Sequence, residues 1–483
     1  MSTSRSRWTA LAVLCAGMLM IILDGSIVTV ALPAIQRDLD FSPAGLTWTV
    51  NAYLIAFGGL LLLAGRLGDL VGRRRMFVAG LTVFTLASLL CGFATSQEVL
   101  IAARFLQGAG GAAASAVSLG MIIALFPEPR ERGQAIGAFS FVGAAGASIG
   151  QVLGGVLTES AGWHWIFFIN VPIGVAAVLL AVRVLAKDRG PGLGAGADAL
   201  GGLLVTAGLM LTVYTIVQTA DHGWGSARTL GLAALSVLLL AGFVARQATA
   251  ATPLLPLRMF RSRDVTGANL VQVLMVSAMF GFQILIALYL QNVHGYGAAA
   301  TGLAMLPAAV MIGTVSLLLT ARLNARFGER RMLLTGIALL LAGQVLLLRL
   351  PVDAVYAVHL LPTMILAAGF GLAISAVTVL GMSGAGTDDA GVASGLFNTT
   401  QQVGGALGVA VLSTLAAART GTLAAAGEST AAALTGGFRL AFGIGAGLLV
   451  AAGVLAAVVL RRPRPATPER PAPTEHPSPL PTS

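Results

Sequence analysis

Fourteen long apolar runs constrain this chain more strongly than any other feature of its sequence. Each run is about 18–26 residues long, and a helix needs about 20 apolar residues to cross the hydrocarbon core of a bilayer. The runs begin near Trp8, Leu46, Met76, Val99, Gln134, His164, Ala199, Thr229, Val265, Ala300, Met332, Ala354, Gly391 and Phe438. We therefore expect an all-α polytopic membrane protein with 14 transmembrane helices. The first run carries Asp24 and no small-residue cleavage site follows it, so we expect a span there and not a signal peptide.

The composition excludes an ordinary soluble enzyme. Only 10% of the residues are charged, whereas soluble domains carry about 25%. The net charge of +10 resembles that of a nucleic-acid-binding protein, but the basic residues lie in short loops between apolar runs. Basic loops of this kind are topology signals, so we expect no nucleic-acid partner. Cys15 and Cys91 both lie inside apolar runs, so we expect neither a disulfide nor a metal site.

The distribution of basic residues predicts the orientation. With fourteen spans both termini lie on one side, and 23 of the 29 basic residues then fall on that side. Five fall on the other side, and Arg104 lies within a run. By the positive-inside rule, the chain is expected in the cell inner membrane with both termini cytoplasmic.

Two loops resemble each other and predict an internal duplication. Gly65–Arg75 reads GRLGDLVGRRR and follows the second run, and Ala321–Arg331 reads ARLNARFGERR and follows the tenth. Because eight runs separate the loops, two extra spans must lie between two six-helix halves, giving a 6+2+6 arrangement. The expected domains are a six-helix bundle at 1–186, a linker with two extra helices at 187–263, a second bundle at 264–460 and a disordered, Pro-rich cytoplasmic tail at 461–483.

The first of these loops is a candidate conformational gate. Its members are Gly65, Asp69, Gly72, Arg73 and Arg74. The glycines permit a tight turn between helices, and the carboxylate can pair with the arginines or with a nearby helix N-terminus. A plain positive-inside loop would explain the arginines but not the acid or the glycines. The second copy has Ala325 and Glu329 at the places of the acid and the first arginine, so we expect a degenerate scaffold there.

Asp24 and Arg104 are the ionisable residues that lie deep within apolar runs. Asp24 is about 16 residues into the first run, and Arg104 is about six residues into the fourth, which predicts a similar depth. A buried acid must be paired, hydrated or protonated, so Asp24 can exchange a proton and Arg104 can promote its release. Two alternatives stay open at this stage: a structural Asp24 capped by backbone or by Ser26, and an Arg104 that snorkels to the interface.

Glycines and polar residues in other runs predict helix packing and a substrate cavity. Gly146, Gly150 and Gly154 repeat every fourth residue, and with Gly155 they provide a face on which a neighbouring helix can approach closely. The candidate cavity residues are Asn51, Tyr53, Gln107, Gln151, Gln283, Asn398 and Gln401. In any single case, hydrogen bonding between helices is an equally good interpretation.

Six stretches resemble a known family. GRLGDLVGRRR resembles the signature loop of the major facilitator superfamily. The stretches that resemble its fourteen-helix drug/proton antiporters, the EmrB/QacA type, are LDGSIVTVALP, LIAARFLQGAGGAA, GAAGASIGQVLGG, WHWIFFINVPIG and ASGLFNTTQQVGGALG, which begin at 23, 100, 143, 163 and 393. The family normally has proline after the glycine at 150, and Gln151 at that place weakens the antiporter interpretation of that one motif.

This resemblance implies an export mechanism. Two helical bundles would rock around a central cavity, and Asp24 would bind the proton whose gradient drives export of small lipophilic compounds. The expected partners are such a substrate, protons and the lipid bilayer, with the chain as a monomer that needs no cofactor beyond the proton gradient and is not an enzyme. A proton-coupled uptake symporter on the same fold and a non-transporting membrane sensor are the alternatives.

Overall fold

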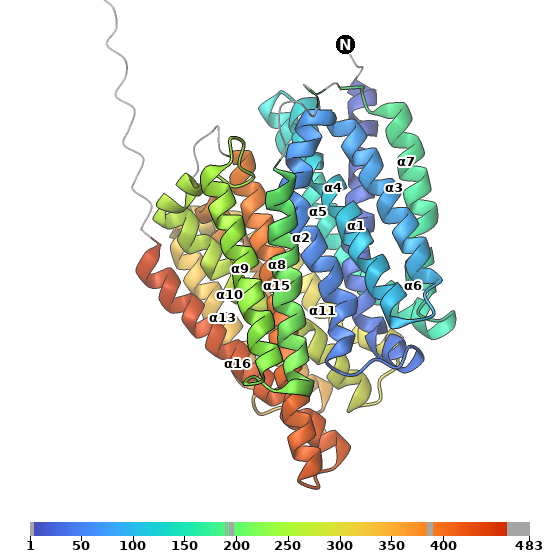
Figure 1. The fold of residues 1–483 in the computed structure, drawn as a ribbon, viewed down its shortest axis with the longest axis vertical. Coiled ribbons are helices and arrows are strands. Elements are labelled where there is room, and N and C mark those ends of the chain that lie inside the picture. Colours follow the sequence, from blue (N-terminus) through green and yellow to red (C-terminus); the bar gives the residue numbers. More distant parts are fainter. Residues whose placement is uncertain (1–3, 189, 191, 193–197, 384–389, 461–483) are drawn as a thin grey trace, which may run out of the picture.

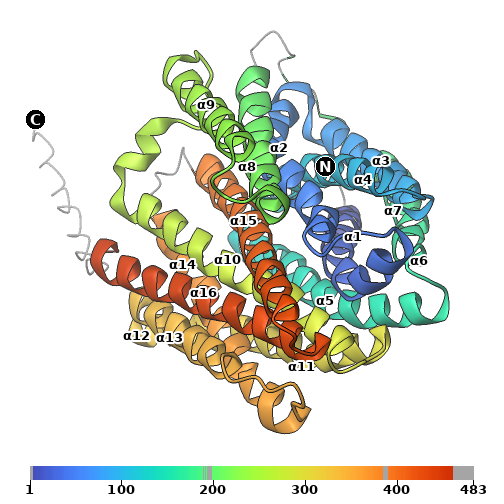
Figure 2. The same cartoon turned by 60° about the horizontal axis from the view of Figure 1, so that its bottom comes forward.

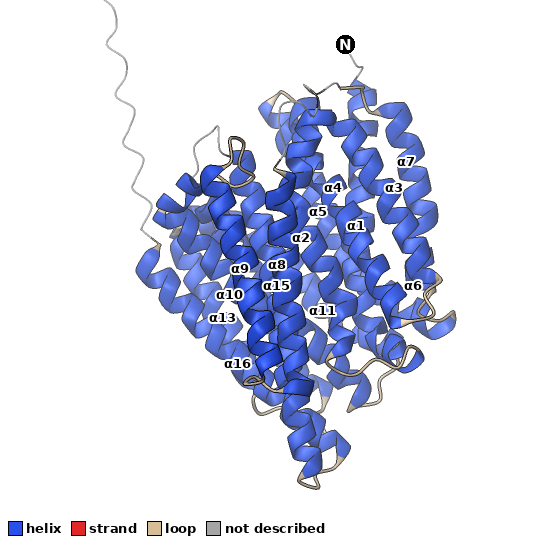
Figure 3. Ribbon diagram, in the orientation of Figure 1, coloured by secondary structure: helices blue, strands red, loops and turns tan. Residues whose placement is uncertain are grey.

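The computed structural model describes residues 4–188, 190, 192, 198–383 and 390–460, which form helices and connecting loops (Figure 3). The first group of helices is α1 (Ser4–Asp38), α2 (Trp48–Val71), α3 (Arg73–Gly92), α4 (Gln97–Leu125), α5 (Pro129–Ser160), α6 (Trp165–Phe168) and α7 (Asn170–Val184). Next are α8 (Ala199–His222) and α9 (Ala227–Thr249). The last group is α10 (Arg263–Asn292), α11 (Ala298–Thr314), α12 (Thr320–Phe327), α13 (Glu329–Leu347), α14 (Met364–Ser383), α15 (Ala390–Ala425) and α16 (Thr430–Val459).

Twelve helical segments in the described part of the chain are long and apolar enough to cross a membrane. The count of fourteen from the sequence is therefore not confirmed. The difference lies at the fifth and tenth apolar runs. The fifth run forms α5, which has 32 residues and is rich in glycine and alanine. The tenth forms α11, which has only 17 residues and continues through a π-helical segment, Val315–Leu319, into α12.

The helices form two groups with separate hydrophobic cores. One core draws its buried residues almost entirely from α1–α8, and the other almost entirely from α10–α16. Figures 1 and 2 show these groups side by side, with α8 packed against α2 and α15 where these two helices meet, and α9 packed on α8. The face of α9 away from the bundle exposes large aliphatic side chains, among them Leu235, Val237 and Leu238, as a helix that contacts lipid would. The domain boundaries expected from the sequence stay predictions.

Glycine allows the sharp turn in each of the two similar loops. Gly72 between α2 and α3 has φ +104°, and Gly328 between α12 and α13 has φ +82°. These angles lie in the left-handed region, which glycine adopts without the steric cost that a Cβ brings. The same turn therefore connects consecutive helices in both halves.

The glycines of α5 bring helices of the two halves together. Gly150 and Gly154 pack on α1, where an added Cβ on Gly150 would lie 2.9 Å from the carbonyl oxygen of Leu23. Gly146 faces α1 as well. On the opposite side of α5, Gly155 packs directly on the backbone of α11 at Ala298. The predicted glycine face thus lies in helix contacts, and one of them joins the two halves.

Candidate functional site

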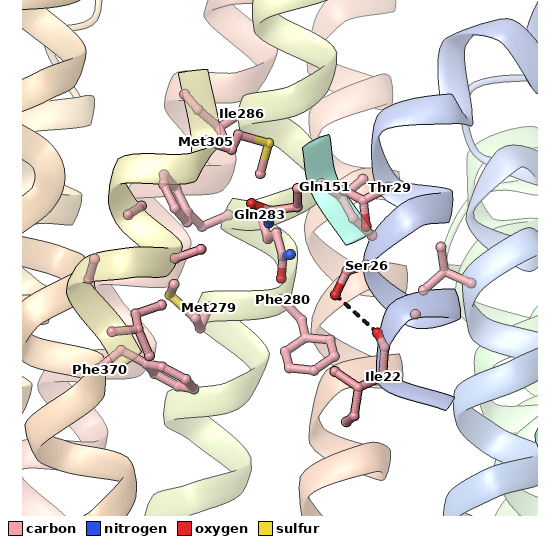
Figure 4. Close-up of a pocket in the computed structure, with 18 of the residues that line it drawn as sticks. Ile22, Ser26, Thr29, Gln151, Met279, Phe280, Gln283, Ile286, Met305 and Phe370 are labelled. Carbon is pink, nitrogen blue, oxygen red and sulfur yellow. Dashed lines mark hydrogen bonds between the residues drawn. The ribbon is translucent and has the colours of Figure 1, made fainter. Parts of the chain in front are cut away.

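A cavity of about 430 Å³ lies between the two halves. Its walls are α1, α2, α4 and α5 on one side and α10, α11, α14 and α15 on the other. Figure 4 shows part of it, where Ser26, Thr29, Gln151 and Gln283 lie around the same space as the apolar side chains of Met279, Phe280, Met305 and Phe370. Such a cavity, mostly apolar with a few polar groups, suits a small lipophilic ligand.

Five of the seven candidate cavity residues line this space: Tyr53, Gln151, Gln283, Asn398 and Gln401. The other two do not belong to the lining in this structure. Asn51 is completely buried and lies outside the lining, although Tyr53 two residues later is part of it. Gln107 is engaged in a polar network beside the cavity. Successive residues of a helix point in different directions, so membership of a face cannot be assigned from polarity alone.

The centre of that network is an ion pair between α1 and α4. Asp24 is 0% exposed and Arg104 is 1% exposed, and a terminal nitrogen of Arg104 donates to Oδ2 of Asp24. Oδ1 of Asp24 accepts from Nε2 of Gln107 at 2.7 Å and from Nδ2 of Asn170 at 3.0 Å. The carboxyl group of Asp24 therefore accepts from three donors, which come from two other helices.

The guanidinium of Arg104 is equally well bound. Its Nε donates to the carbonyl of Thr49 at 2.8 Å, and one terminal nitrogen donates to Oε1 of Gln107 at 2.6 Å. It also lies 4.4 Å from the ring centroid of Tyr53, where a cation is attracted by the aromatic face. Arg104 therefore does not snorkel. The cap considered for Asp24 is not formed by Ser26, whose hydroxyl donates to the carbonyl of Ile22 at 3.2 Å.

The cavity reaches this pair from one side only. Arg104 and Tyr53 belong to its lining, whereas Asp24 does not. A ligand in the cavity can consequently touch the guanidinium but meets the acid only through it. The arrangement can couple the charge of a buried carboxyl group to what occupies the cavity.

The candidate gate loop lies at the end of the bundle where the N-terminus is found (Figure 1). Arg73 donates to Oδ1 of Asp69 at 3.0 and 3.1 Å and to the carbonyl of Gly120 in α4 at 3.2 Å. Arg74 reaches from the same turn to the carbonyl of Val182 in α7. Gly65 lies one helical turn before Asp69 in α2, and an added Cβ there would be 3.9 Å from Ala116, an ordinary van der Waals contact. The loop thus ties α2 and α3 to α4 and α7.

Asp188 is a contributor to this loop that sequence reasoning missed. Its carboxylate accepts from the backbone N–H of Arg73 at 2.6 Å and of Arg74 at 3.2 Å, so it caps the N-terminus of α3. An acid at a helix N-terminus is favourable, and Asp69 had been considered for this role. In the sequence, Asp188 stands out only because it directly follows Lys187, the single lysine of the chain. That position does not indicate which helix Asp188 caps.

These observations define a polytopic helical membrane transporter with a central cavity between two similar halves. A model of the Major Facilitator Superfamily matches residues 14–409. The chain belongs to this superfamily. Proteins of this superfamily, including the relatives described next, are transporters and not enzymes.

Similarity to curated proteins extends over most of the chain. The chain is 40% identical over 464 residues to a puromycin resistance protein of Streptomyces alboniger, and the alignment covers 94% of this chain and 91% of that protein. It is also 40% identical over 417 residues to a cephamycin export protein of Amycolatopsis lactamdurans, covering 86% of each. Among solved structures, an inward-facing, unoccupied bacterial homologue of the human lysosomal transporter Spinster aligns with a TM-score of 0.68. That alignment covers 96% of this chain and 100% of the other at 17% identity, so it shows the fold alone.

Proposed function

We propose that this protein is a proton-coupled antiporter that exports small lipophilic compounds from the cell by alternating access. The observation that carries the proposal is the fully buried pair of Asp24 and Arg104 beside the central cavity. If a buried acid binds a proton with different affinity in the two conformations, a pH gradient shifts the equilibrium between them. The antibiotics in the names of the two relatives support efflux as the direction.

The proposal includes the fourteen-helix topology of the EmrB/QacA type. At 1.5 Å per residue, the 32 residues of α5 are long enough to cross the hydrocarbon core. The 17 residues of α11, together with the 5 of the π-helical segment and the 8 of α12, are also long enough to cross it. Fourteen spans place both termini on one side, and the arginine-rich loops then make that side cytoplasmic.

Contacts between the halves support an inward-facing state. The carboxylate of Glu159, at the end of α5, accepts from the backbone N–H of Ala299 in α11 at 3.1 Å. Nε2 of Gln291, at the end of α10, donates to the carbonyl of Val30 in α1 at 2.9 Å. Both contacts lie at the end of the bundle away from the N-terminus, so they close the cavity towards the outside (Figure 1). An antiporter releases its proton inward, and the ionised pair fits that state.

The cycle follows from the position of Arg104 between Asp24 and the cavity. In the inward state Asp24 is ionised and holds Arg104, and substrate enters the cavity. After the change to the outward state, Asp24 takes up a proton and its hold on Arg104 weakens, which alters the cavity wall as substrate leaves. Because coupling is reciprocal, substrate and proton each lower the affinity of the protein for the other.

The cavity lining favours a neutral or singly charged substrate that carries a hydrogen-bond donor. The described lining residues include one charged side chain, Arg104, and no carboxylate. Gln151 is buried, and its Oε1 lacks a partner among the described residues. A substrate hydroxyl or amide N–H at this place would satisfy that acceptor. A dication would find no counter-charge there.

The experiment is pH-gradient-driven efflux in proteoliposomes, with puromycin as the first substrate tested and counterflow without a gradient measured in parallel. Asp24→Asn keeps size and hydrogen bonding but cannot release a proton, so driven efflux should fall to background while counterflow persists. Asp38→Asn is the matched control, because Asp38 is in the same helix but lies at its exposed end, where it accepts from Trp163 at 2.9 Å. If Asp24→Asn still concentrates substrate at the wild-type rate, the mechanism is wrong. Gradient-driven movement in the direction of uptake would favour a symporter.

A further inference from the structure

Asn170 is a side-chain amide that donates to Asp24 and that the transport cycle above does not use. It is the first residue of α7, where the chain restarts after the short helix α6, and it is 0% exposed. Its Nδ2 donates to Oδ1 of Asp24 and to Oγ of Ser88, each at 3.0 Å. Ser88 in turn donates to the carbonyl of Phe167 at 3.0 Å. Asn170 does not belong to the lining of the cavity.

The other end of the same amide is unsatisfied. Oδ1 of Asn170 is buried and has no hydrogen-bond partner in the described structure. A buried acceptor without a donor is costly, and native structures rarely keep one without a reason. The neighbouring amide oxygen, Oε1 of Gln107, differs, since it already accepts from Arg104 at 2.6 Å. Asn170 thus holds the spare acceptor beside the acid.

Protonation of Asp24 would supply the missing donor. A carboxylate only accepts hydrogen bonds, whereas a carboxylic acid has one O–H that must find an acceptor. If the amide of Asn170 turns over, Oδ1 occupies the present place of Nδ2, 3.0 Å from both Asp24 and Ser88. The Ser88 hydroxyl can rotate to donate to it, because a hydroxyl is both donor and acceptor. At Asp24, the present orientation of the amide suits the carboxylate and the turned orientation suits the carboxylic acid. The turn moves Nδ2 to the place where Oδ1 has no partner now, and the Ser88 hydroxyl then leaves the carbonyl of Phe167.

The other two side chains with a described hydrogen bond to Asp24, Arg104 and Gln107, offer it no free acceptor, because Oε1 of Gln107 already accepts from Arg104. The titratable side chains that face it are Arg104 from α4, Tyr53 from α2 and Cys91 from α3. The guanidinium is only a donor. From α5, Gly150 faces the backbone beside Asp24 and offers no side chain.

We propose that Asn170 is a positioning residue that sets the proton affinity of Asp24: Nδ2 donates to the carboxylate, and after a turn of the amide Oδ1 accepts from the carboxylic acid. The inference rests on the proposed function, since it assumes that Asp24 is the proton site. It adds a residue from the sixth span to a site otherwise built from the first and fourth.

The first test is the pH dependence of driven efflux in Asn170→Leu, with the full-length protein in proteoliposomes. Hydrogen bonds to a charged group are about twice as strong as neutral ones, so the ionised acid loses more than the neutral one. The pH midpoint should move to higher pH by about one unit. Asn51→Leu is the matched control, because Asn51 is an equally buried asparagine in the same half that makes no hydrogen bond to Asp24, and its midpoint should stay in place. Asn170→Ala and Asn51→Ala repeat the comparison if the leucine variants do not reach the membrane.

The outcome separates this inference from the proposed function. If the pH midpoint of efflux does not move in Asn170→Leu or Asn170→Ala while Asp24→Asn loses gradient-driven efflux, the role of Asn170 alone is overturned. If Asp24→Asn keeps gradient-driven efflux, the proposed function itself is overturned. An equal shift in the Asn51 variants would show a general packing effect and would also overturn the role of Asn170.

A second measurement tests the acceptor. Infrared difference spectra between low and high pH should contain the C=O band of protonated Asp24, identified by its loss in Asp24→Asn. In Asn170→Ala that band should move to higher wavenumber, because the acid has lost its hydrogen-bond acceptor. A band at the wild-type position would show that Oδ1 does not receive the proton's hydrogen bond.

Discussion

The two halves of the molecule share a packing frame but differ in the chemistry placed on it. Eight residues after the loop glycine, each half has a second glycine at a close helix crossing, Gly80 in α3 and Gly336 in α13. An added Cβ would lie 2.7 Å from the carbonyl oxygen of Gly110 in the first crossing and 2.7 Å from that of Gly369 in the second. The contacts of backbone with backbone are therefore the same in both copies.

A second shared contact ties the loop to the last helix of each half. Arg74 donates to the carbonyl of Val182 near the end of α7. The aligned Arg330 donates to the carbonyl of Ala457 near the end of α16 at 2.6 Å. The aligned acid is not shared, since Ala325 stands at the place of Asp69. The second loop thus keeps the mechanical connection and loses the ion pair.

The network of Asp24, Arg104 and Asn170 lies in the first half, and the aligned described positions of the second half do not repeat its residues. Arg104 lies six residues before Gly110, and the residue six before Gly369 is Thr363. Gly445 stands where Asn170 would be when Val182 and Ala457 are aligned. A Cβ on Gly445 would meet Nε2 of Gln344 at 2.7 Å, so a side-chain amide fills the space there. The comparison teaches that the packing frame is retained in both halves, whereas the charged site is an addition to the first.

The largest effect should come from breaking the shared frame. Gly80→Val and Gly336→Val should each prevent the accumulation of folded protein, because the added atoms would meet backbone at 2.5 to 2.7 Å and backbone cannot rotate away. Overpacking of this kind typically costs about 1–3 kcal/mol and occasionally more. Detergent-solubilised yield on size-exclusion chromatography, followed by thermal unfolding, measures the loss.

Gly447→Val is the control for this pair, since the structure has nothing within 4 Å of an added Cβ there. It should leave yield and unfolding temperature near the wild-type values. If one of the two crossing variants were as stable as the control, the halves would not depend equally on the same contact.

An intermediate effect should come from the position at which the halves differ. Arg104→Gln removes the charge that holds Asp24 ionised, so the acid should keep its proton and driven efflux should fall by at least about tenfold. Thr363→Val changes the cavity wall at the aligned position and should alter substrate preference without changing the pH midpoint. Both are measured as pH-driven efflux in proteoliposomes. A strong dependence of the pH midpoint on Thr363 would mean that coupling is shared between the halves.

The smallest effect should come from the ion pair of the gate loop. Asp69→Asn should slow turnover by about twofold and leave substrate affinity unchanged, because an exposed pair of this kind is worth about 0.3–0.5 kcal/mol. The side chains of Asp69 and Arg73 are 53% and 41% exposed, which places the effect at this low end. Glu329→Gln in the other loop should leave turnover unchanged. A large loss of substrate binding in Asp69→Asn would contradict the position of this loop outside the cavity.

The sequence predicted the helices and the depth of Asp24 and Arg104 well, because both follow from local rules. Apolar runs form helices in a membrane, and counting residues along two antiparallel helices brings the two charges to a similar level. Cavity membership was harder to predict. Asn51 and Tyr53 are two residues apart in one helix, yet only the tyrosine faces the cavity. The count of spans differs at α5 and α11, where glycine, alanine and a short helix weaken the apolar signal.

By itself, the sequence determined that the chain forms apolar helices, that its two halves are related and that one of them carries a buried charge. These properties depend on composition, spacing and the cost of ionised groups in hydrocarbon. Only the tertiary structure decided that Asn170 and Ser88 complete the site of Asp24, and that Asp188 caps α3. Asn170 is 82 positions from Ser88 and 146 positions from Asp24 along the chain. Asp188 is 115 positions from Arg73. Such a hydrogen bond depends on which helix faces meet, and that is settled by the packing of the whole bundle.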